Sequence, residues 1–320
     1  MNNVKRGEIL FLYDCRETNP NGDPADENRP RMDDETGINI VTDVRLKRTI
    51  RDYILSAYKD QKGKYVFVKE ERDKEGSLKT REERIKEILG DTKLKLDKAK
   101  KILEHCIDLR LFGATIAGKS EKKGENVFTW VGPVQFRFGH SLHRVEPKLI
   151  CGTTVMPSGK GKEEKQKQGT FTECWVVPYS LICFYGVVNE HAAEETMLSN
   201  EDLEILREAL WKGTKSINTR TKMGQMPRLL LHIEYNTADT IGDLDRLIKC
   251  HSKKEDSKIR SIEDFSIDVT MLLKRISQYK SKISCIHLAV DPDAKFVKDG
   301  KEIDLENELK QYCKVICCKF

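Results

Sequence analysis

Two stretches of this sequence carry side chains that could do chemistry, one acidic and one basic. Residues 18–37, "TNPNGDPADENRPRMDDETG", offer carboxylates beside Asn and Gly, as calcium-binding loops do. Prolines and two internal arginines break the ligand spacing of such loops, so we interpret the stretch as a stiff, solvated connector. Residues 211–228, "WKGTKSINTRTKMGQMPR", contain no acidic residue. Hydroxyls, amides and glycine N–H groups beside Arg and Lys are typical of phosphate contacts, which favours polyanion binding over a merely soluble loop.

The motifs of common catalytic sites are missing. No G-x-S-x-G, H-E-x-x-H or G-x-x-x-x-G-K-[ST] pattern occurs in the chain. His140 and His143 are close in sequence, but on a strand they would point to opposite faces. The ten cysteines include no CxxC pair, so the paired ligand spacing of zinc sites is absent. We therefore expect no catalytic residue, no metal and no cofactor.

The composition indicates a chain that buries a core beneath a highly charged surface. Of 320 residues, 34% are charged and 38% are hydrophobic, enough for one large domain or two smaller ones. The net charge of +5 is too small to indicate a polyanion partner by itself, so local clusters must carry that argument. The longest apolar run, "CWVVPYSLICFYGVV", is shorter than a membrane-spanning helix requires, and no signal peptide is recognisable. We expect a cytoplasmic protein with no membrane contact.

Hydrophobic periodicity predicts the elements around the acidic stretch. "EILFLYDC" before it reads as a buried strand, and Thr42 or Asp43 after it can cap a helix. Arg45 and Arg48 would then lie one turn apart near the helix N-terminus, where the helix dipole favours a phosphate. The alternative is an ordinary solvated helix face.

The middle of the chain predicts further helices and strands. After a short strand "KYVFVKE", residues 72–109 predict two charged helices, of which the first ends at Gly90. One strand is predicted over "FTWVGPVQFRFGHSLHRV", with Phe136 and Phe138 on its core face; base stacking is the alternative role for these rings. The polar, Lys-rich segment "CGTTVMPSGKGKEEKQKQGTF" predicts a projecting hairpin or a loop.

Without the polar and helical insertions, the predicted order is strand, helix, strand, strand, helix, strand. This order is that of an α+β, ferredoxin-like fold, which RNA-recognition domains share. The order alone says little about function, because the same fold serves many purposes.

Three segments resemble one protein family. "NPNGDPADENRPRMDDETGINIVTDVRLKRTIRDYI", "VGPVQFRFGHSLHRVE" and "NTRTKMGQMPRLLLHIEY" occur in this order and together resemble the backbone subunit of type I CRISPR surveillance complexes (Cascade). That subunit is CRISPR-associated protein family 7 of the RAMP superfamily, here in its I-B/I-C-like branch. The resemblance implies a non-enzymatic scaffold that binds CRISPR guide RNA and presents it to a target DNA strand. It also implies head-to-tail stacking with further copies of itself and contact with other Cascade subunits.

The resemblance further implies a hand-like architecture. A ferredoxin-like, RNA-recognition-like palm would span residues 1–320 with insertions. These would be helical fingers at about 61–126, a β-hairpin thumb at about 150–172 and a smaller insertion at about 237–282.

The resemblance also carries over candidate RNA-binding residues. They are Arg45, Lys47 and Arg48 on the first helix, Ser141 and Arg144 near the thumb base, Lys160 and Lys162 in the thumb, and Asn218, Arg220, Thr221 and Lys222 in the basic stretch. Met156 and Phe171 are candidates for displacing a base.

An alternative function is a metal-dependent endoribonuclease, since related type III backbone subunits cut RNA with an Asp near the thumb. Residues 139–172 contain no Asp, although the acidic stretch could supply one in space, such as Asp33.

Overall fold

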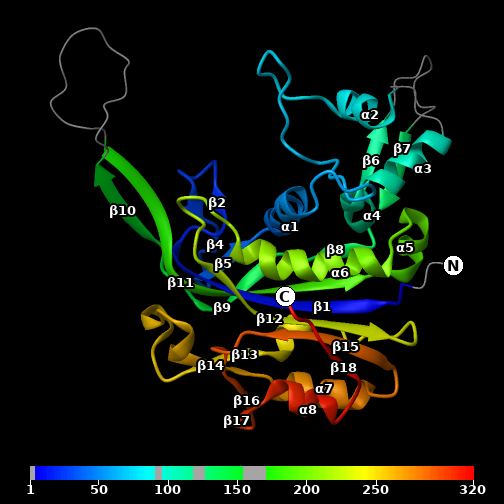
Figure 1. The fold of residues 1–320 in the computed structure, drawn as a ribbon. Helices are drawn as coiled ribbons and strands as arrows, with labels where there is room; N and C mark the ends of the chain where they lie inside the picture. Colours follow the sequence, from blue (N-terminus) through cyan, green and yellow to red (C-terminus); the bar gives the residue numbers. More distant parts are fainter. Residues whose placement is uncertain (1–3, 91–95, 118–126, 154–170) are drawn as a thin grey trace, which may run out of the picture.

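Ten strands of the described residues form one sheet in the middle of the molecule; the computed structural model describes residues 4–90, 96–117, 127–153 and 171–320 (Figure 1). The strands are β1 (Gly7–Thr18), β4 (Met32–Asp33), β5 (Ile38–Val41), β8 (Val134–Phe136), β9 (Gly139–Arg144), β10 (Lys148–Thr153), β11 (Phe171–Val188), β12 (Gln225–Tyr235), β15 (Ile283–Val290) and β18 (Val315–Cys317). Their order is β18-β15-β12-β1-β11-β9-β5-β4, and β8 and β10 also pair with β11.

The predicted first strand is confirmed as β1, which lies between β11 and β12 and is antiparallel to both. Its side chains alternate between two hydrophobic clusters. Ile9 and Phe11 belong to the cluster on one face of the sheet, and Leu10 and Leu12 belong to the cluster on the other. This two-sided burial explains the uninterrupted apolar run in the sequence.

Helices cover one face of the sheet. They are α1 (Asp43–Ala57), α4 (Ile107–Phe112), α5 (Glu190–Thr196) and α6 (Asn200–Glu208). The predicted helix after the acidic stretch is confirmed as α1, because the Thr42 side chain caps it by accepting a hydrogen bond from the backbone N–H of Arg45. Leu46, Ile50 and Ile54 bury its apolar side against the sheet.

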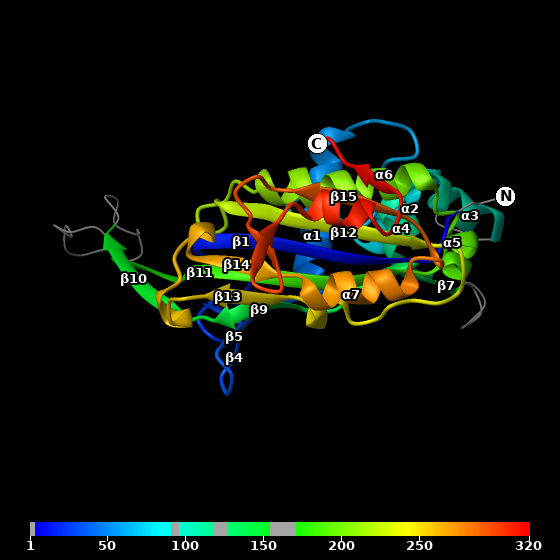
Figure 2. The same ribbon diagram turned by 90° about the horizontal axis from the view of Figure 1, so that it is seen from below.

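The opposite face carries two helices and a small sheet. The helices are α7 (Thr270–Tyr279) and α8 (Leu305–Lys310), and the strands are β13 (Lys249–Ser252), β14 (Phe265–Asp268), β16 (Phe296–Lys298) and β17 (Lys301–Ile303). Figure 2 views the molecule from this side. The small sheet has the order β13-β14-β16-β17, so it joins segments from both sides of the β15 strand in sequence.

A separate unit packs beside α1 with a core of its own. It contains α2 (Arg81–Leu89), α3 (Leu96–His105) and the hairpin of β6 (Gly113–Ala117) with β7 (Val127–Val131). Ile85, Ile102 and Ile116 belong to its hydrophobic cluster. The prediction that the first of these helices ends at Gly90 is confirmed, because this residue has φ +73° in the left-handed region.

A two-stranded ribbon projects from the body at the other end. β10 pairs antiparallel with the first part of β11, from Lys148 opposite Val176 to Thr153 opposite Phe171 (Figures 1 and 2). A second, short ribbon of β2 (Gly22–Asp23) and β3 (Arg29–Pro30) lies within the acidic stretch. No helix in the described part of the chain combines the length and apolarity needed to cross a bilayer.

The predicted strand at residues 64–70 is wrong. Tyr65 forms only an isolated bridge to Cys106. The N–H groups of Phe67 and Val68 instead donate to the buried carboxylate of Asp108 at 2.8 and 3.0 Å, which takes the place of a strand partner. The second predicted helix of this region is also divided at Cys106, into α3 and α4.

The single strand predicted over residues 128–145 is divided into β7, β8 and β9. The chain turns at Gly132, where a Cβ atom would lie 2.1 Å from the carbonyl carbon of Phe112. Phe136 is buried, as the core prediction requires, but Phe138 is 51% exposed, so that prediction is wrong for the second ring. Phe138 lies outward because β8 already ends at Phe136.

A fully buried carboxylate ties the central strand to the segment after β12. Glu8 accepts hydrogen bonds from the hydroxyls of Tyr185 (2.5 Å) and Tyr235 and from the N–H groups of Ile241 and Gly242, both at 2.8 Å. Three of these donors are bonded to Glu8 alone, while the Ile241 N–H also lies 3.3 Å from the Tyr235 hydroxyl.

We expect Glu8→Gln to lower the free energy of unfolding by about 2–4 kcal/mol, because the amide turns a donor toward donors in a buried site. Urea denaturation measures the change. The control Glu302→Gln, on the exposed surface of β17, should leave stability within about 0.5 kcal/mol of wild type. Equal stability of the two variants would contradict the proposed role of the Glu8 network.

Candidate nucleic-acid interface

The acidic stretch joins the start of α1 to the basic stretch. The side-chain oxygen of Asn21 accepts hydrogen bonds from the N–H (2.8 Å) and the hydroxyl (2.9 Å) of Thr42, the capping residue of α1. Two residues earlier, the N–H of Asn19 donates to the carbonyl of Thr221 at 2.6 Å. The stretch is therefore a connector, as predicted, and it fixes two basic segments beside each other.

Lys222 lies at this junction. Its ammonium group donates to the carbonyl of Asn19 at 2.9 Å. Burial, reinforced by the nearby charge of Arg45, lowers the pKa of Lys222 to about 8. This lysine is thus held in place by the backbone rather than by a carboxylate.

Arg45 faces the same junction from the first turn of α1. Burial lowers the pKa of Arg45, and the neighbouring charge of Arg48 adds to this effect, while Asp52 opposes it. Asp52 is itself engaged by Arg48, whose Nε lies 2.8 Å from its carboxylate. Within the described part of the chain, neither Arg45 nor Lys222 has a carboxylate at ion-pair distance.

Two half-buried cations beside each other raise the electrostatic energy of the free protein. The N-terminus of the 15-residue helix α1 adds a partial positive charge. An anion at this point would relieve both effects, so the geometry suits a phosphate group.

The remainder of the basic stretch extends this surface. Asn218 and Arg220 are exposed, and Thr221 is half-buried beside Asn19. Met223, in the same turn, is 64% exposed. The structure therefore brings Arg45 together with this stretch, although about 170 residues separate them in sequence.

Two candidate residues make hydrogen bonds within the fold. Lys47 is held by Asp43 at 3.0 Å and by Gln135 at 2.8 Å, and its ammonium lies over the Phe112 ring. Ser141 is 4% exposed; its hydroxyl donates to the carbonyl of His143 and accepts from a backbone N–H of β5. The polar groups of these two side chains are thus bonded within the protein, and their contact with RNA stays a prediction.

The candidate residues near the projecting ribbon lie on several separate segments. Arg144 is exposed, and its backbone N–H donates to Asp256 at 2.8 Å. Phe171 begins β11 opposite Thr153. Lys160, Lys162 and Met156 lie outside the described residues.

Sequence reasoning missed one contact that links the ribbon to the interface. The guanidinium of Arg29 lies over the ring of Trp175 in β11, 5.5 Å from its centroid. Asn19 and Asn21 were also missed as structural residues. The high Asn content of the stretch was the available signal. However, a residue that supports a helix cap from a distant position has no fixed spacing in the sequence from that helix.

The carboxylates of the acidic stretch are used locally. Asp23 pairs with Arg31 at 2.7 Å, and Asp33 accepts from the Thr36 hydroxyl at 2.6 Å. This stretch, which is described throughout, contributes no group of three close metal-ligating side chains.

Comparison with solved structures identifies the fold. The chain is similar to a chain of a structure described as "CRISPR RNA-guided surveillance complex, pre-nicking", with a TM-score of 0.56, 11% identity, and coverage of 98% of this chain and 96% of that chain. A chain of a second "CRISPR RNA-guided surveillance complex" gives a TM-score of 0.53 at 12% identity, over 97% and 94% of the two chains. At these identities the similarity establishes an α+β fold of this kind and no more.

Sequence comparison then establishes the family. The family model for CRISPR-associated protein Cas7 matches residues 5–270. The "CRISPR-associated protein Cas7" of Haloferax volcanii is 33% identical over 331 residues, covering 96% of this chain and 91% of that protein. The chain belongs to the Cas7 family, which confirms the resemblance found in its sequence; placement in the I-B/I-C-like branch stays a prediction.

The buried position of Lys222 predicts a pH dependence of stability. Its pKa is about 8 in the folded chain against the usual 10.5. At pH values between the two pKa values, the unfolded chain binds more protons than the folded chain does. Lys222 therefore makes the free energy of unfolding rise with pH. Urea denaturation of RNA-free protein from pH 7.5 to 10 should therefore show wild type gaining stability relative to Lys222→Met. Parallel pH profiles would mean that Lys222 is solvated in the native state.

Proposed function

We propose that this chain is a non-enzymatic guide-RNA-binding scaffold of a type I CRISPR surveillance complex. The observation that carries the proposal is the pair of half-buried cations, Arg45 and Lys222, at the N-terminus of α1, which have no carboxylate partner among the described residues. Family membership supports the same role. Several copies would follow one RNA head to tail, through a heterologous interface that does not close.

The sheet supports the description of a ferredoxin-like palm. The strands β12, β1, β11 and β9 are adjacent in this order, all neighbouring pairs are antiparallel, and helices follow β1 and β11 in the chain. We assign the fingers to the unit around α2 and α3, and the thumb to the ribbon of β10 and β11. The layer built by α7 and the small sheet includes the predicted insertion at about 237–282, together with strands β16 and β17 beyond it.

Phosphate contacts are proposed for the side chains that lie on one surface around the α1 N-terminus. These are Arg45, Asn218, Arg220, Thr221 and Lys222. Arg144 at the thumb base, and Lys160 and Lys162 in the thumb, are proposed as further contacts. Arg48 remains available at the rim, because an exposed ion pair such as its pair with Asp52 is weak. Base displacement by Met156 or Phe171 remains part of the proposal.

Such contacts suit a scaffold because a guide must be held whatever its sequence. Phosphate contacts position a strand without reading it, and base pairing then selects the target DNA strand. The proposed assembly also includes other Cascade subunits and works in the cytoplasm.

Removing one phosphate contact should weaken binding to every RNA sequence alike. Arg45→Ala and Lys222→Ala are each expected to lower affinity about tenfold for unrelated single-stranded RNAs. Each should also reduce the slope of log K against log salt by about 0.7, the value for one contact to a single strand. Fluorescence anisotropy titrations at several salt concentrations measure both quantities.

The matched control is Lys301→Ala, an exposed lysine of β17 on the opposite layer, which should leave affinity and slope unchanged. Wild-type affinity and slope in both interface variants would show that RNA binds elsewhere.

The scaffold and the nuclease alternative predict different outcomes with target RNA. If the chain is a scaffold, incubation of the assembled protein with magnesium and RNA complementary to the guide should leave that RNA intact, because the acidic stretch uses its carboxylates locally. Gel electrophoresis of end-labelled RNA measures this. Periodic cleavage that disappears in Asp33→Ala would establish an endoribonuclease instead.

A further inference from the structure

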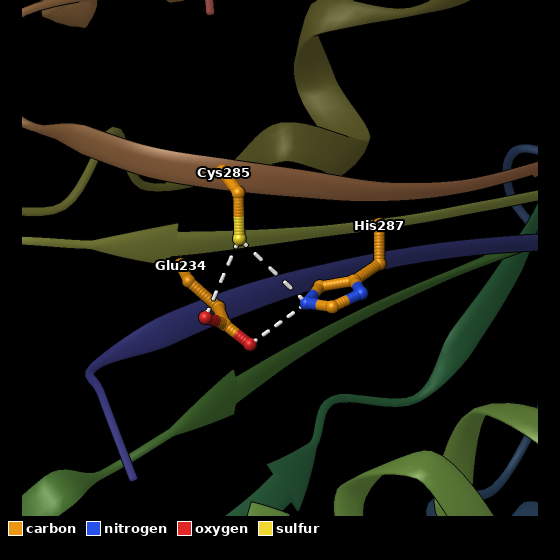
Figure 3. Close-up of side chains that lie close together, drawn as sticks. All are labelled: Glu234, Cys285 and His287. Atoms are coloured by element: carbon orange, nitrogen blue, oxygen red, sulfur yellow. Dashed lines mark hydrogen bonds and ion pairs between the residues drawn. The ribbon is translucent and has the colours of Figure 1, made fainter. Parts of the chain in front are cut away.

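A cluster of metal-ligating side chains lies far from the proposed RNA surface. Glu234 of β12 and Cys285 and His287 of β15 place one ligand atom each within 4.8 Å of the others, the single group of this kind in the described part of the chain. Figure 3 shows the three side chains converging from the two neighbouring strands.

The strand register fixes this arrangement. Glu234 pairs directly with Cys285, and His287 follows two residues along β15, so all three point to the face covered by α6. Cys285 is buried, while Glu234 and His287 keep 18% and 12% of their side chains exposed. The cluster is therefore preformed but open on one side.

The distances within the cluster are those of a tetrahedral metal site. Zinc bound at its usual ligand distances would separate the sulfur from the nitrogen by about 3.6 Å, the sulfur from the oxygen by about 3.6 Å and the nitrogen from the oxygen by about 3.4 Å. Here the Cys285 sulfur lies 3.7 Å from the His287 nitrogen and 3.4 Å from Oε2 of Glu234, whereas that nitrogen lies 2.9 Å from the other oxygen, Oε1. The carboxylate must therefore rotate to present one oxygen to an ion. Small side-chain shifts suffice to accommodate the ion.

We propose that Glu234, Cys285 and His287 bind one zinc ion that ties β12 to β15 and completes its coordination with a ligand from solvent. A thiolate, an imidazole and a carboxylate together select zinc over magnesium or calcium, which prefer oxygen ligands. The ion's two positive charges are balanced by the carboxylate and the thiolate.

Other ionisable side chains border the cluster. His232 stacks on His287 with ring centroids 5.6 Å apart, and it receives a contact from Arg207 of α6 at 3.1 Å. Lys5 is bonded to Ser284 and Asn236 at the edge of the cluster. In the metal-free chain the Cys285 thiol donates to Glu234, and zinc binding would displace that proton to solvent.

This inference does not rest on RNA binding. Glu234 lies near the end of β12, whereas Lys222 precedes the first residue of that strand, Gln225, so the two sites are about 30 Å apart along one strand. Zinc content and RNA affinity are therefore separate measurements.

The test uses the full-length protein, treated with chelator, incubated with zinc chloride and dialysed. Elemental analysis should find about one zinc per chain in wild type and in the control Cys250→Ser, whose half-buried thiol lies on β13, and less than a tenth of that in Cys285→Ser and His287→Gln. Circular dichroism confirms that the variants are folded.

A second measurement needs no variant. Zinc should protect Cys285 of wild type from maleimide labelling, mapped by peptide mass spectrometry, while labelling of Cys250 stays unchanged. Absence of zinc from wild type, equal zinc in all four proteins, or unprotected Cys285 would each overturn the proposal.

Discussion

The structure depends on one strand that must be buried on both faces. β1 lies between β11 and β12, and Ile9 to Tyr13 are buried, with Ile9 and Leu10 fully so. Each such side chain contributes about 1.5–3 kcal/mol when it leaves water. Both faces of the sheet therefore need a covering layer, which α1 and α6 supply on one side and α7 with the small sheet on the other. The buried carboxylate of Asp14 on β1 is compensated, because it lies 2.9 Å from Arg228 and accepts a hydrogen bond from Tyr179 at 2.7 Å.

The two ends of β1 determine where the two proposed sites lie. Its C-terminal end leads directly into Asn19 and Asn21, which hold the N-terminus of α1 and the basic stretch together. Its first residue, Gly7, pairs with Glu234 of the proposed zinc site. One strand thus sets the separation between a surface that attracts phosphate and a cluster suited to a metal ion.

For binding of a polyanion, the distribution of ion-pair partners matters more than the net charge of +5. Lys47, Arg48 and Arg31 are neutralised by carboxylates close to them in sequence. Arg45 and Lys222 are brought together by folding and meet no carboxylate in the part of the chain that the structure describes. A polyanion gains most where the protein has left positive charge uncompensated, and this point coincides with a helix N-terminus.

The sequence by itself determined the elements whose signals are local. These include β1 from its apolar run, α1 from its cap at Thr42, the end of α2 at Gly90, and the family from three long segments. Tertiary structure decided which candidates face solvent: Lys47 and Ser141 find partners inside the protein, and Phe138 turns outward. It also decided the two clusters. Arg45 meets Lys222, and Glu234 meets Cys285, only because strand register and hydrogen bonds bring together residues far apart in the chain. Such contacts leave no periodic trace in a single sequence.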